Sequence, residues 1–292
     1  MKEELTDYDY IITLLRQQNF HFSKAFGQNF LSEKTVVSDI LNTASPDWKT
    51  DVLEIGPGIG TLTIGLADKA HKVVAVERDE RLKPILQKTL AGKKNVELLF
   101  NDILKTDIPS LTKNSLKENQ RIVCANIPYS ITTPLIAKLL QSECFSEMVL
   151  MVQKEVAERI CASAGTKAYS AFTILCQWYA QCTILRIVPA SCFIPEPKVD
   201  SAVIKMEIRR EEPCQCESKN ILFTVVQAAF NQRRKTLSNA LYSKFPEISK
   251  DEISKMIQSC GLPPDIRGER LTLQEFAEVS DALAIQFEKN IY

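Results

Sequence analysis

The chain of 292 residues lacks an excess of charge of either sign, because 36 Lys and Arg residues face 36 Asp and Glu residues. A uniformly basic surface is therefore excluded, and any nucleic acid would have to bind at a local basic face. The composition, 45% hydrophobic and 25% charged, excludes a disordered, collagen-like or disulfide-scaffold chain. The length suits one large or two ordinary domains.

Histidine is scarce and the cysteines are not arranged in pairs. His21 and His71 have no partner at metal-ligand spacing, so we expect no metal site and no histidine-based triad. The nine cysteines are odd in number and scattered, and only Cys214 and Cys216 are close in sequence. This pattern favours a reducing, cytoplasmic location.

The sequence also lacks a segment that is typical of a membrane span. The longest uncharged stretch lies between Lys167 and Arg186 and contains Gln177 and Gln181. It predicts a buried helix followed by a strand. The acidic, polar N-terminus does not resemble a secretory signal. We expect a monomer that does not associate with membranes.

Short apolar strands alternate with helices over much of the chain. The predicted strands cover residues 52–55, 72–76, 96–100, 121–125 and 148–152, and the predicted helices cover 6–19, 33–43, 61–69, 80–90, 134–141 and 154–162. Such alternation predicts an α/β fold with a parallel sheet covered on both faces. Residues 202–208 alternate in polarity and predict an antiparallel edge strand.

A polar stretch at residues 209–220 breaks this pattern. The chain after it is predicted to be helical, at about 221–232, 235–244, 251–259 and 272–288. We therefore expect a catalytic domain at residues 1–209 and a smaller, all-helical domain at residues 210–292.

Unusual residues follow the first three predicted strands. A glycine-rich turn, Gly56–Gly60, ends the first strand, Glu77 ends the second and Asp102 ends the third. Ligands of open parallel sheets bind beyond these strand ends, where Glu77 can accept ribose hydroxyls and Asp102 an adenine amino group. The turn alone is equally compatible with an ordinary tight connection. Thr61 departs from the dinucleotide fingerprint, so the combination favours an adenosine with a short charged tail, such as S-adenosylmethionine.

The segment Asn126–Tyr129 follows the fourth strand and suits methylation of an exocyclic amine of a base. Such a nitrogen is a poor nucleophile because its lone pair is delocalised, so the site needs alignment and hydrogen-bond acceptors. The Asn126 side-chain oxygen and the carbonyl of Ile127 or Pro128 can accept the amine protons, while Pro128 stiffens the turn. Tyr129 offers a face on which the base can stack. An ordinary Asn-Pro turn is the alternative interpretation.

A second aromatic residue, Phe193, lies in a loop that Pro195 and Pro197 make rigid and extended. This loop is a candidate for the opposite face of a base sandwich. By residue type alone, however, a phenylalanine belongs more often to the core.

Eight motifs in this order make the chain resemble the ribosomal RNA adenine dimethyltransferase family over nearly its whole length. They are residues 27–31 (GQNFL), 54–60 (EIGPGIG), 101–102 (ND), 126–129 (NIPY), 153–159 (QKEVAER), 193–201 (FIPEPKVDS), 229–237 (AFNQRRKTL) and 267–271 (RGERL). The resemblance implies a Rossmann-like class I methyltransferase sheet and S-adenosylmethionine as cofactor. It also implies dimethylation of the N6 amino groups of two adjacent adenosines near the 3′ end of 16S ribosomal RNA in the small subunit, with a role in ribosome biogenesis.

The resemblance further assigns roles to single residues. It implies that the cofactor is bound by Asn29, Leu31, Gly56, Glu77, Asp102 and Asn126. It implies that Asn126 also contacts the target amine and that Tyr129 and Phe193 bracket the adenine. We group Pro128, which stiffens the turn, with these three as the predicted catalytic residues.

Three alternatives remain beside this interpretation. Ser130 blurs the distinction from the 23S ribosomal RNA adenine methyltransferases of antibiotic resistance, although residues 132–134 (TTP), residues 153–157 and the helical C-terminus favour 16S RNA. A ribosome-assembly binding factor with incidental catalysis is a second alternative. A nicotinamide-dependent oxidoreductase is disfavoured by Thr61 and by the lack of a site histidine.

The best candidate for a local basic face is the run Arg233, Arg234 and Lys235. A charge run is most often a solvated helix face. In a separate helical domain it can instead grip backbone phosphates while an unpaired adenine enters the other domain. We expect replacement of all three residues by Glu to weaken RNA binding but not cofactor binding.

Overall fold

The computed structural model describes residues 4–23, 27–117 and 120–291. Two compact units can be distinguished. Unit 1 comprises residues 1–157 and 181–208, and unit 2 comprises residues 158–180 and 209–292. The sequence predicted a single domain boundary between residues 209 and 210. In the structure, the chain enters unit 2 at residue 158, returns to unit 1 at residue 181, and enters unit 2 again at residue 209.

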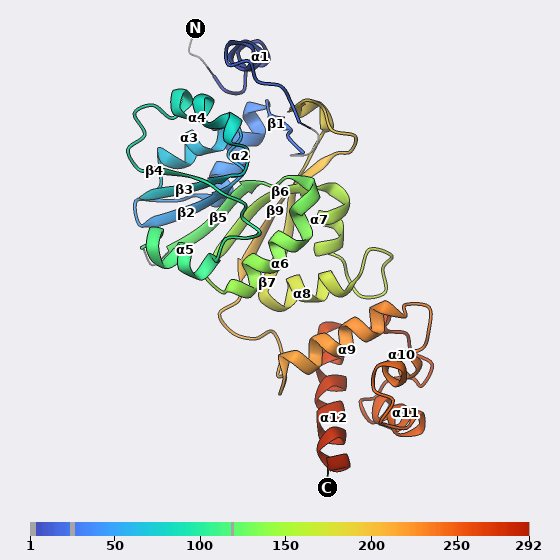
Figure 1. Cartoon of the computed structure of the whole chain (residues 1–292). Helices are drawn as coiled ribbons and strands as arrows, with labels where there is room; N and C mark the ends of the chain where they lie inside the picture. The colour runs from blue at the N-terminus through green and yellow to red at the C-terminus, as the bar shows by residue number, and fades with distance from the viewer. Residues whose placement is uncertain (1–3, 24–26, 118–119, 292) are drawn as a thin grey trace. The chain divides into compact units, whose positions relative to one another are not determined.

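The described part of the chain contains a seven-stranded sheet in the order β4-β3-β2-β5-β6-β9-β7 (Figure 1). Its strands are β2 (Thr50–Ile55), β3 (Lys72–Glu77), β4 (Val96–Phe100), β5 (Gln120–Asn126), β6 (Glu147–Gln153), β7 (Ala180–Val188) and β9 (Ser201–Ile208). Strands β4, β3, β2, β5 and β6 pair in parallel, which confirms the predicted parallel sheet. Their carboxyl ends therefore meet at one edge.

Strand β9 pairs antiparallel with β6, as predicted, but the prediction that it forms an edge was wrong. It lies between β6 and β7, and its residues Ser201–Ile204 are buried. Strand β7 alternates between exposed and partly buried positions, as a strand at the margin of a sheet does. The alternating polarity of residues 202–208 did not reveal that β7 lies next to β9 in the same sheet, on the side away from β6.

Helices on both faces of the unit 1 sheet leave strand β2 completely buried. The α-helices in the described part of unit 1 are α1 (Tyr8–Gln17), α2 (Lys34–Ala44), α3 (Thr61–Ala67), α4 (Lys83–Thr89), α5 (Ile108–Ser115) and α6 (Thr132–Ser142), while α7 (Lys154–Ile160) ends in unit 2. Apolar residues of α2 and α3, including Val36 and Leu66, pack with Val52 and Val73 of the sheet. The short helix α5 was not predicted, because only two of its residues, Ile108 and Leu111, are large and apolar.

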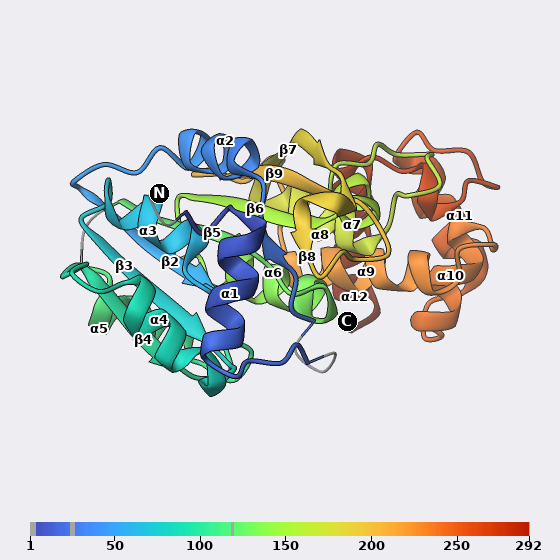
Figure 2. The same cartoon turned by 90° about the horizontal axis from the view of Figure 1, so that it is seen from above.

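The N-terminal part of the chain adds a layer to unit 1 (Figure 2). Ile11 and Leu14 of α1 share an apolar cluster with Ile85 and Leu86 of α4. Farther along, β1 (Phe30–Leu31) pairs antiparallel with β8 (Phe193–Ile194), a two-residue contact that the sequence did not predict.

Unit 2 is helical, and the described part has one main apolar core. Its helices are α8 (Ala171–Tyr179), α9 (Lys219–Asn231), α10 (Leu237–Lys244), α11 (Lys250–Ser259) and α12 (Leu273–Ile291). Ile174 and Trp178 of α8 are buried together with Leu222 and Phe276. This packing explains why residues 158–180 belong with the C-terminal helices. Helix α8 and strand β7 also confirm the predicted helix followed by a strand. Over the described residues, the helices are too short or too polar to cross a bilayer.

Candidate active site

A cavity that is open to solvent lies at the carboxyl ends of the parallel strands of unit 1. Its walls come from the turn after β2, the ends of β3, β4 and β5, and residues 27–31 of the N-terminal part. Eight of the predicted site residues line it: Asn29, Leu31, Gly56, Glu77, Asp102, Asn126, Pro128 and Tyr129. The fold thus brings together residues that are up to 100 positions apart in sequence.

The glycine-rich turn requires glycine for two different reasons. Gly56 and Gly58 have positive φ angles of 67° and 60°, a region that favours glycine. In addition, a Cβ atom on Gly58 would lie 3.0 Å from Cδ1 of Phe30. The missing side chain therefore lets β1 cross close above the turn.

Glu77 is the last residue of β3, and Asp102 lies two residues beyond the end of the neighbouring strand β4. The Glu77 carboxylate is 7% exposed and accepts hydrogen bonds from the backbone N–H groups of Arg78 and Asp79, at 2.8 Å each, and of Gly58, at 3.3 Å. Burial raises the pKa of Glu77 above its usual value, and these three donors only partly oppose that effect. Asp102 accepts a hydrogen bond from the N–H of Leu104 and lies 3.7 Å from Nε of Arg78.

The amide of Asn126 has a defined orientation. Its Nδ2 donates to the backbone oxygen of Asn29 at 3.1 Å, while the Asn29 amide donates to the oxygen of Gly27 at 3.2 Å. The backbone N–H of Ile127 donates to Met151 of the neighbouring strand. With Nδ2 engaged by the N-terminal part, Oδ1 is the end of the amide that can receive a proton donor from the cavity.

Tyr129 is held through its hydroxyl group, which lies 2.7 Å from Oγ of Ser201. Ser201 is completely buried at the start of β9, so this contact restrains the position of the ring. Burial raises the pKa of Tyr129, which keeps the hydroxyl protonated. Ser201 belongs to one of the motifs described above, but the sequence offered no role for it.

The structure does not bring Phe193 to the cavity wall. Its side chain is 3% exposed and packs in an apolar cluster with Leu31 and Val203. Leu31, its partner across the β1–β8 pair, does line the cavity. Phe193 therefore supports the wall from behind in this structure, and its contact with a base stays a prediction.

Glu54 is a site residue that sequence reasoning missed. It lines the cavity, is 1% exposed, and its Oε2 has no hydrogen-bond partner among the described residues. Burial raises the pKa of this carboxyl to about 8, and the nearby Glu77 carboxylate adds to the effect. An acidic residue directly before the glycine-rich turn, between the apolar residues Leu53 and Ile55, was the signal in the sequence.

The predicted basic cluster of unit 2 divides into two parts. Arg233 is half-buried, forms an ion pair with Glu269, and donates to the backbone oxygens of Thr166 and Lys167 at 3.2 and 3.0 Å. Arg234 and Lys235 are exposed. Among the described residues, no group of three His, Cys, Asp or Glu side chains could hold a metal ion.

Comparison with known proteins places the chain in a family. The sequence profile of the ribosomal RNA adenine dimethylases matches residues 19–283. The chain belongs to the ribosomal RNA adenine dimethylase family. Ribosomal RNA small subunit methyltransferase A of Streptococcus pneumoniae strain D39 is 45% identical over 284 residues, which are 96% of this chain and 98% of that protein. The protein of the same name from Lactococcus lactis is 45% identical over 92% of each chain.

Solved structures agree with the fold. A dimethyladenosine transferase from Plasmodium falciparum is 27% identical, covers 89% of this chain and 98% of its own, and superposes with a TM-score of 0.73. The 23S rRNA methyltransferase ErmE, 24% identical, covers 88% of this chain and all of its own with a TM-score of 0.69. The predicted Rossmann-like methyltransferase fold with a helical C-terminal part is confirmed.

Proposed function

We propose that the protein transfers methyl groups from S-adenosylmethionine to the N6 amino groups of two adjacent adenosines near the 3′ end of 16S ribosomal RNA. Family membership and the relatives named as small-subunit methyltransferases support the reaction and its substrate. In this role the protein acts as a cytoplasmic monomer on the small subunit or its precursor, and contributes to ribosome biogenesis.

The cavity residues fit this cofactor in charge and in hydrogen-bonding capacity. Glu77 and Asp102 offer carboxylate oxygens for the ribose and the adenine amino group, and Gly56 lets the backbone approach the ligand. The unpartnered Oε2 of Glu54 is a buried acceptor that calls for a cationic or N–H partner, which the ammonium group of the cofactor tail provides. Asn29 and Leu31 would hold the cofactor from the N-terminal side.

The observation that carries the proposal is the hydrogen bond from Asn126 Nδ2 to the oxygen of Asn29. The bound cofactor supplies a methyl group on a positively charged sulfur atom. The protein has to hold the amine nitrogen in line with that carbon and accept the amine protons. The oriented Oδ1 of Asn126 suits this purpose, and Tyr129, restrained by Ser201, offers a stacking face for the adenine. No strong base is needed.

RNA would be held in part by unit 2. Arg234 and Lys235 are exposed and suit contacts with phosphates. Arg233 is engaged with Glu269 and two backbone oxygens, so we propose that it shapes the basic turn and contributes less directly to phosphate binding.

The alternatives are less well supported. ErmE, a 23S methyltransferase, shares the fold at 24% identity, whereas the small-subunit methyltransferases are 45% identical over nearly the whole chain. Family membership also argues against a nicotinamide-dependent oxidoreductase. An assembly factor with incidental catalysis would not need an intact site at Asn126 for its main role, whereas the proposed methyltransferase does.

The proposal can be tested by incubating the protein and a methyl-labelled donor with 30S particles that lack the modification. We expect label in two adjacent N6,N6-dimethyladenosines near the 3′ end of the 16S RNA. Parallel reactions with unmodified 23S RNA distinguish the main alternative. Label in 23S RNA alone would reject the proposed substrate, and binding to 30S particles without transfer would favour the assembly factor.

A further inference from the structure

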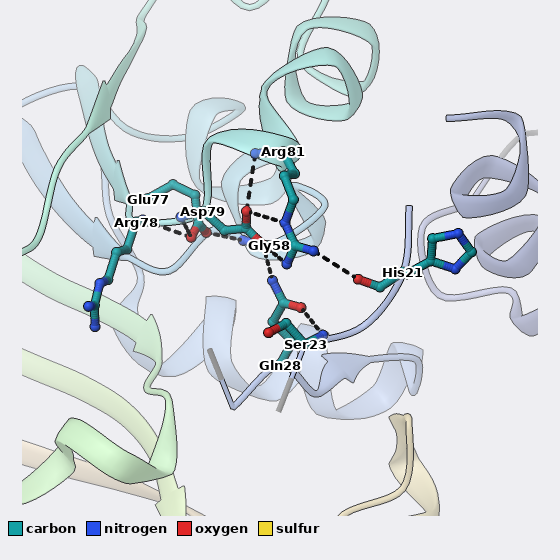
Figure 3. A network of polar contacts seen from close by, with 8 residues as sticks. All are labelled: His21, Ser23, Gln28, Gly58, Glu77, Arg78, Asp79 and Arg81. Carbon is teal, nitrogen blue, oxygen red and sulfur yellow. Dashed lines mark hydrogen bonds and ion pairs between the residues drawn. The ribbon is translucent and has the colours of Figure 1, made fainter. Parts of the chain in front are cut away.

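Asp79 is a buried carboxylate that lies two residues beyond Glu77 and is 2% exposed. Its Oδ1 accepts hydrogen bonds from the backbone N and Nε of Arg81, at 3.1 and 2.8 Å. Its Oδ2 accepts from Nη2 of Arg81 and from Nε2 of Gln28, at 2.6 Å each (Figure 3). Both oxygens are thus fully engaged, and Gln28 comes from a segment 51 residues away.

Asp79 and its partner Arg81 contact the N-terminal arm, which we define as residues 20–23 and 27–31, at two places. On one side, Oε1 of Gln28 accepts from the backbone N of Ser23 at 3.1 Å. On the other, Nη1 of Arg81 donates to the backbone oxygen of His21 at 3.3 Å (Figure 3). The Arg81 guanidinium also lies 5.3 Å from the centre of the Phe20 ring, within cation–π range.

The part of the arm that Gln28 belongs to is a wall of the cavity. Residues 27–31 all line it, and the oxygen of Asn29 holds the Asn126 amide. Asp79 also contacts Glu77, which is predicted to bind the cofactor, because the backbone N–H of Asp79 donates a hydrogen bond to Oε1 of Glu77. Asp79 therefore contacts both the strand end that carries Glu77 and the arm that faces it.

Electrostatics favour a persistent contact. Burial acts to raise the pKa of Asp79, but the hydrogen bonds from Arg81 and Gln28 outweigh it, so the pKa lies below its usual value. A buried, ionised carboxylate that lost one of its donors would keep a desolvated oxygen without a partner. The arm is thus favoured in the position that completes the cavity wall.

We propose that Asp79 is a positioning residue for the methyl donor: through Gln28 it holds the N-terminal arm against the Glu77 side of the cavity. The inference rests on the proposed function for the identity of the ligand. The pair acts on donor binding, and it leaves the alignment of the amine to Asn126 and Tyr129.

Replacement of Gln28 by Met tests this role, because methionine keeps the length of the side chain and removes both hydrogen bonds. Two hydrogen bonds, each worth about 1 kcal/mol net, limit the effect to about thirtyfold. We expect the Kd for S-adenosylhomocysteine and the KM for the donor to rise about tenfold. Because a bound donor holds the arm, and with it the Asn29–Asn126 hydrogen bond, kcat at saturating donor should fall by less than the KM for the donor rises, and the KM for RNA should change less than about twofold. Hydrogen exchange of residues 27–31 in the ligand-free protein should become faster. A purely structural residue would lower the active fraction without moving the Kd.

Gln17→Met is the matched control. Gln17 is an exposed glutamine of α1 that accepts from Lys88 Nζ at 3.2 Å, outside the cavity. Its replacement should leave donor affinity unchanged. A Gln28→Met protein that binds S-adenosylhomocysteine as tightly as the parent would refute the positioning role.

A swap of the two hydrogen-bonding groups provides an independent check. Gln28→Glu opposes two carboxylates and should weaken binding more than Gln28→Met does. Combined with Asp79→Asn, it restores the donor–acceptor pair between positions 28 and 79 but removes the acceptor of Arg81 Nη2, so the affinity should recover in part, to a level above that of Gln28→Glu alone. Absence of recovery in a folded double variant would also contradict the inference. If the unaltered protein failed to bind S-adenosylhomocysteine at all, the proposed function itself would fall.

Discussion

Two glutamates on neighbouring strands show how burial and partners set the state of a side chain. Glu77 is 7% exposed and accepts three backbone N–H groups, whereas Glu54 is 1% exposed and one of its oxygens has no partner among the described residues. Both pKa values are raised by burial, and that of Glu54 reaches about 8. Glu54 is therefore mainly protonated in the ligand-free protein at neutral pH.

This protonation predicts a pH-dependent stability. The pKa of Glu54 in the folded protein, about 8, lies above its ordinary value of 4.5, so the unfolded chain releases the proton first. The contribution to stability is greatest below pH 4.5 and is lost as the pH rises to about 8. Each unit of pKa difference is worth about 1.4 kcal/mol, so we expect a loss of a few kcal/mol across this window.

Urea unfolding of Glu54→Gln and of the parent protein between pH 5 and 8.5 measures this loss. The amide does not titrate, so the variant should gain stability relative to the parent as the pH rises. Groups that do not interact with Glu54 titrate alike in both proteins, so the difference reports Glu54 together with its interaction with Glu77. Parallel stability curves would show that the pKa of Glu54 is not raised.

The single most informative substitution in the site is Asn126→Ala. It removes the oxygen that we expect to accept the amine protons and the Nδ2 bond to Asn29. We expect methyl transfer to fall at least a hundredfold, in the range of a lost transition-state hydrogen bond, while the circular dichroism spectrum stays unchanged. Full turnover by this variant would disprove the proposed chemistry.

At the level of elements, short connections decide how the site is enclosed. The β1–β8 pair has two residues per strand, yet it joins the arm to the segment that precedes β9. The turn at Gly58 permits this close passage. In unit 2, the loop of residues 163–168 is joined to the α9–α10 turn and to Glu269 through Arg233 and the bond from Gly165 N to the Glu269 oxygen.

The interactions of Arg233 predict a structural effect that its neighbour does not share. Arg233→Ala removes an ion pair and two bonds to backbone oxygens, and should lower the free energy of unfolding by about 1–3 kcal/mol. Arg234→Ala, at an exposed position, should change it by less than about 0.5 kcal/mol. Urea titrations of both variants provide the comparison, and equal stabilities would contradict the proposed role of Arg233.

At the level of the whole molecule, the chain has no net charge, so RNA has to bind at a local cluster of basic residues. The combination Arg234→Glu and Lys235→Glu leaves Arg233 in place and reverses two exposed charges. We expect affinity for 30S particles to fall at least tenfold and its salt dependence to weaken, because fewer counterions are released. Affinity for S-adenosylhomocysteine should not change.

The control for this prediction is Lys250→Glu with Lys255→Glu, two exposed lysines of α11 outside the basic run. This variant has the same change in net charge. Filter binding at several salt concentrations compares the two. If both double variants lost affinity equally, net charge rather than the basic turn would govern RNA binding.

The sequence alone was sufficient for the parallel sheet, the glycine turn, the strand-end carboxylates and the family, because each of these depends on a short run of residues. Only the tertiary structure decided which distant segments meet. The bonds from Gln28 to Asp79 and from Tyr129 to Ser201 span 51 and 72 residues. The place of β9 inside the sheet and the burial of Phe193 likewise depend on what packs against them. A local pattern specifies backbone conformation and polarity, whereas the partner of a side chain is chosen by the packing of the whole chain.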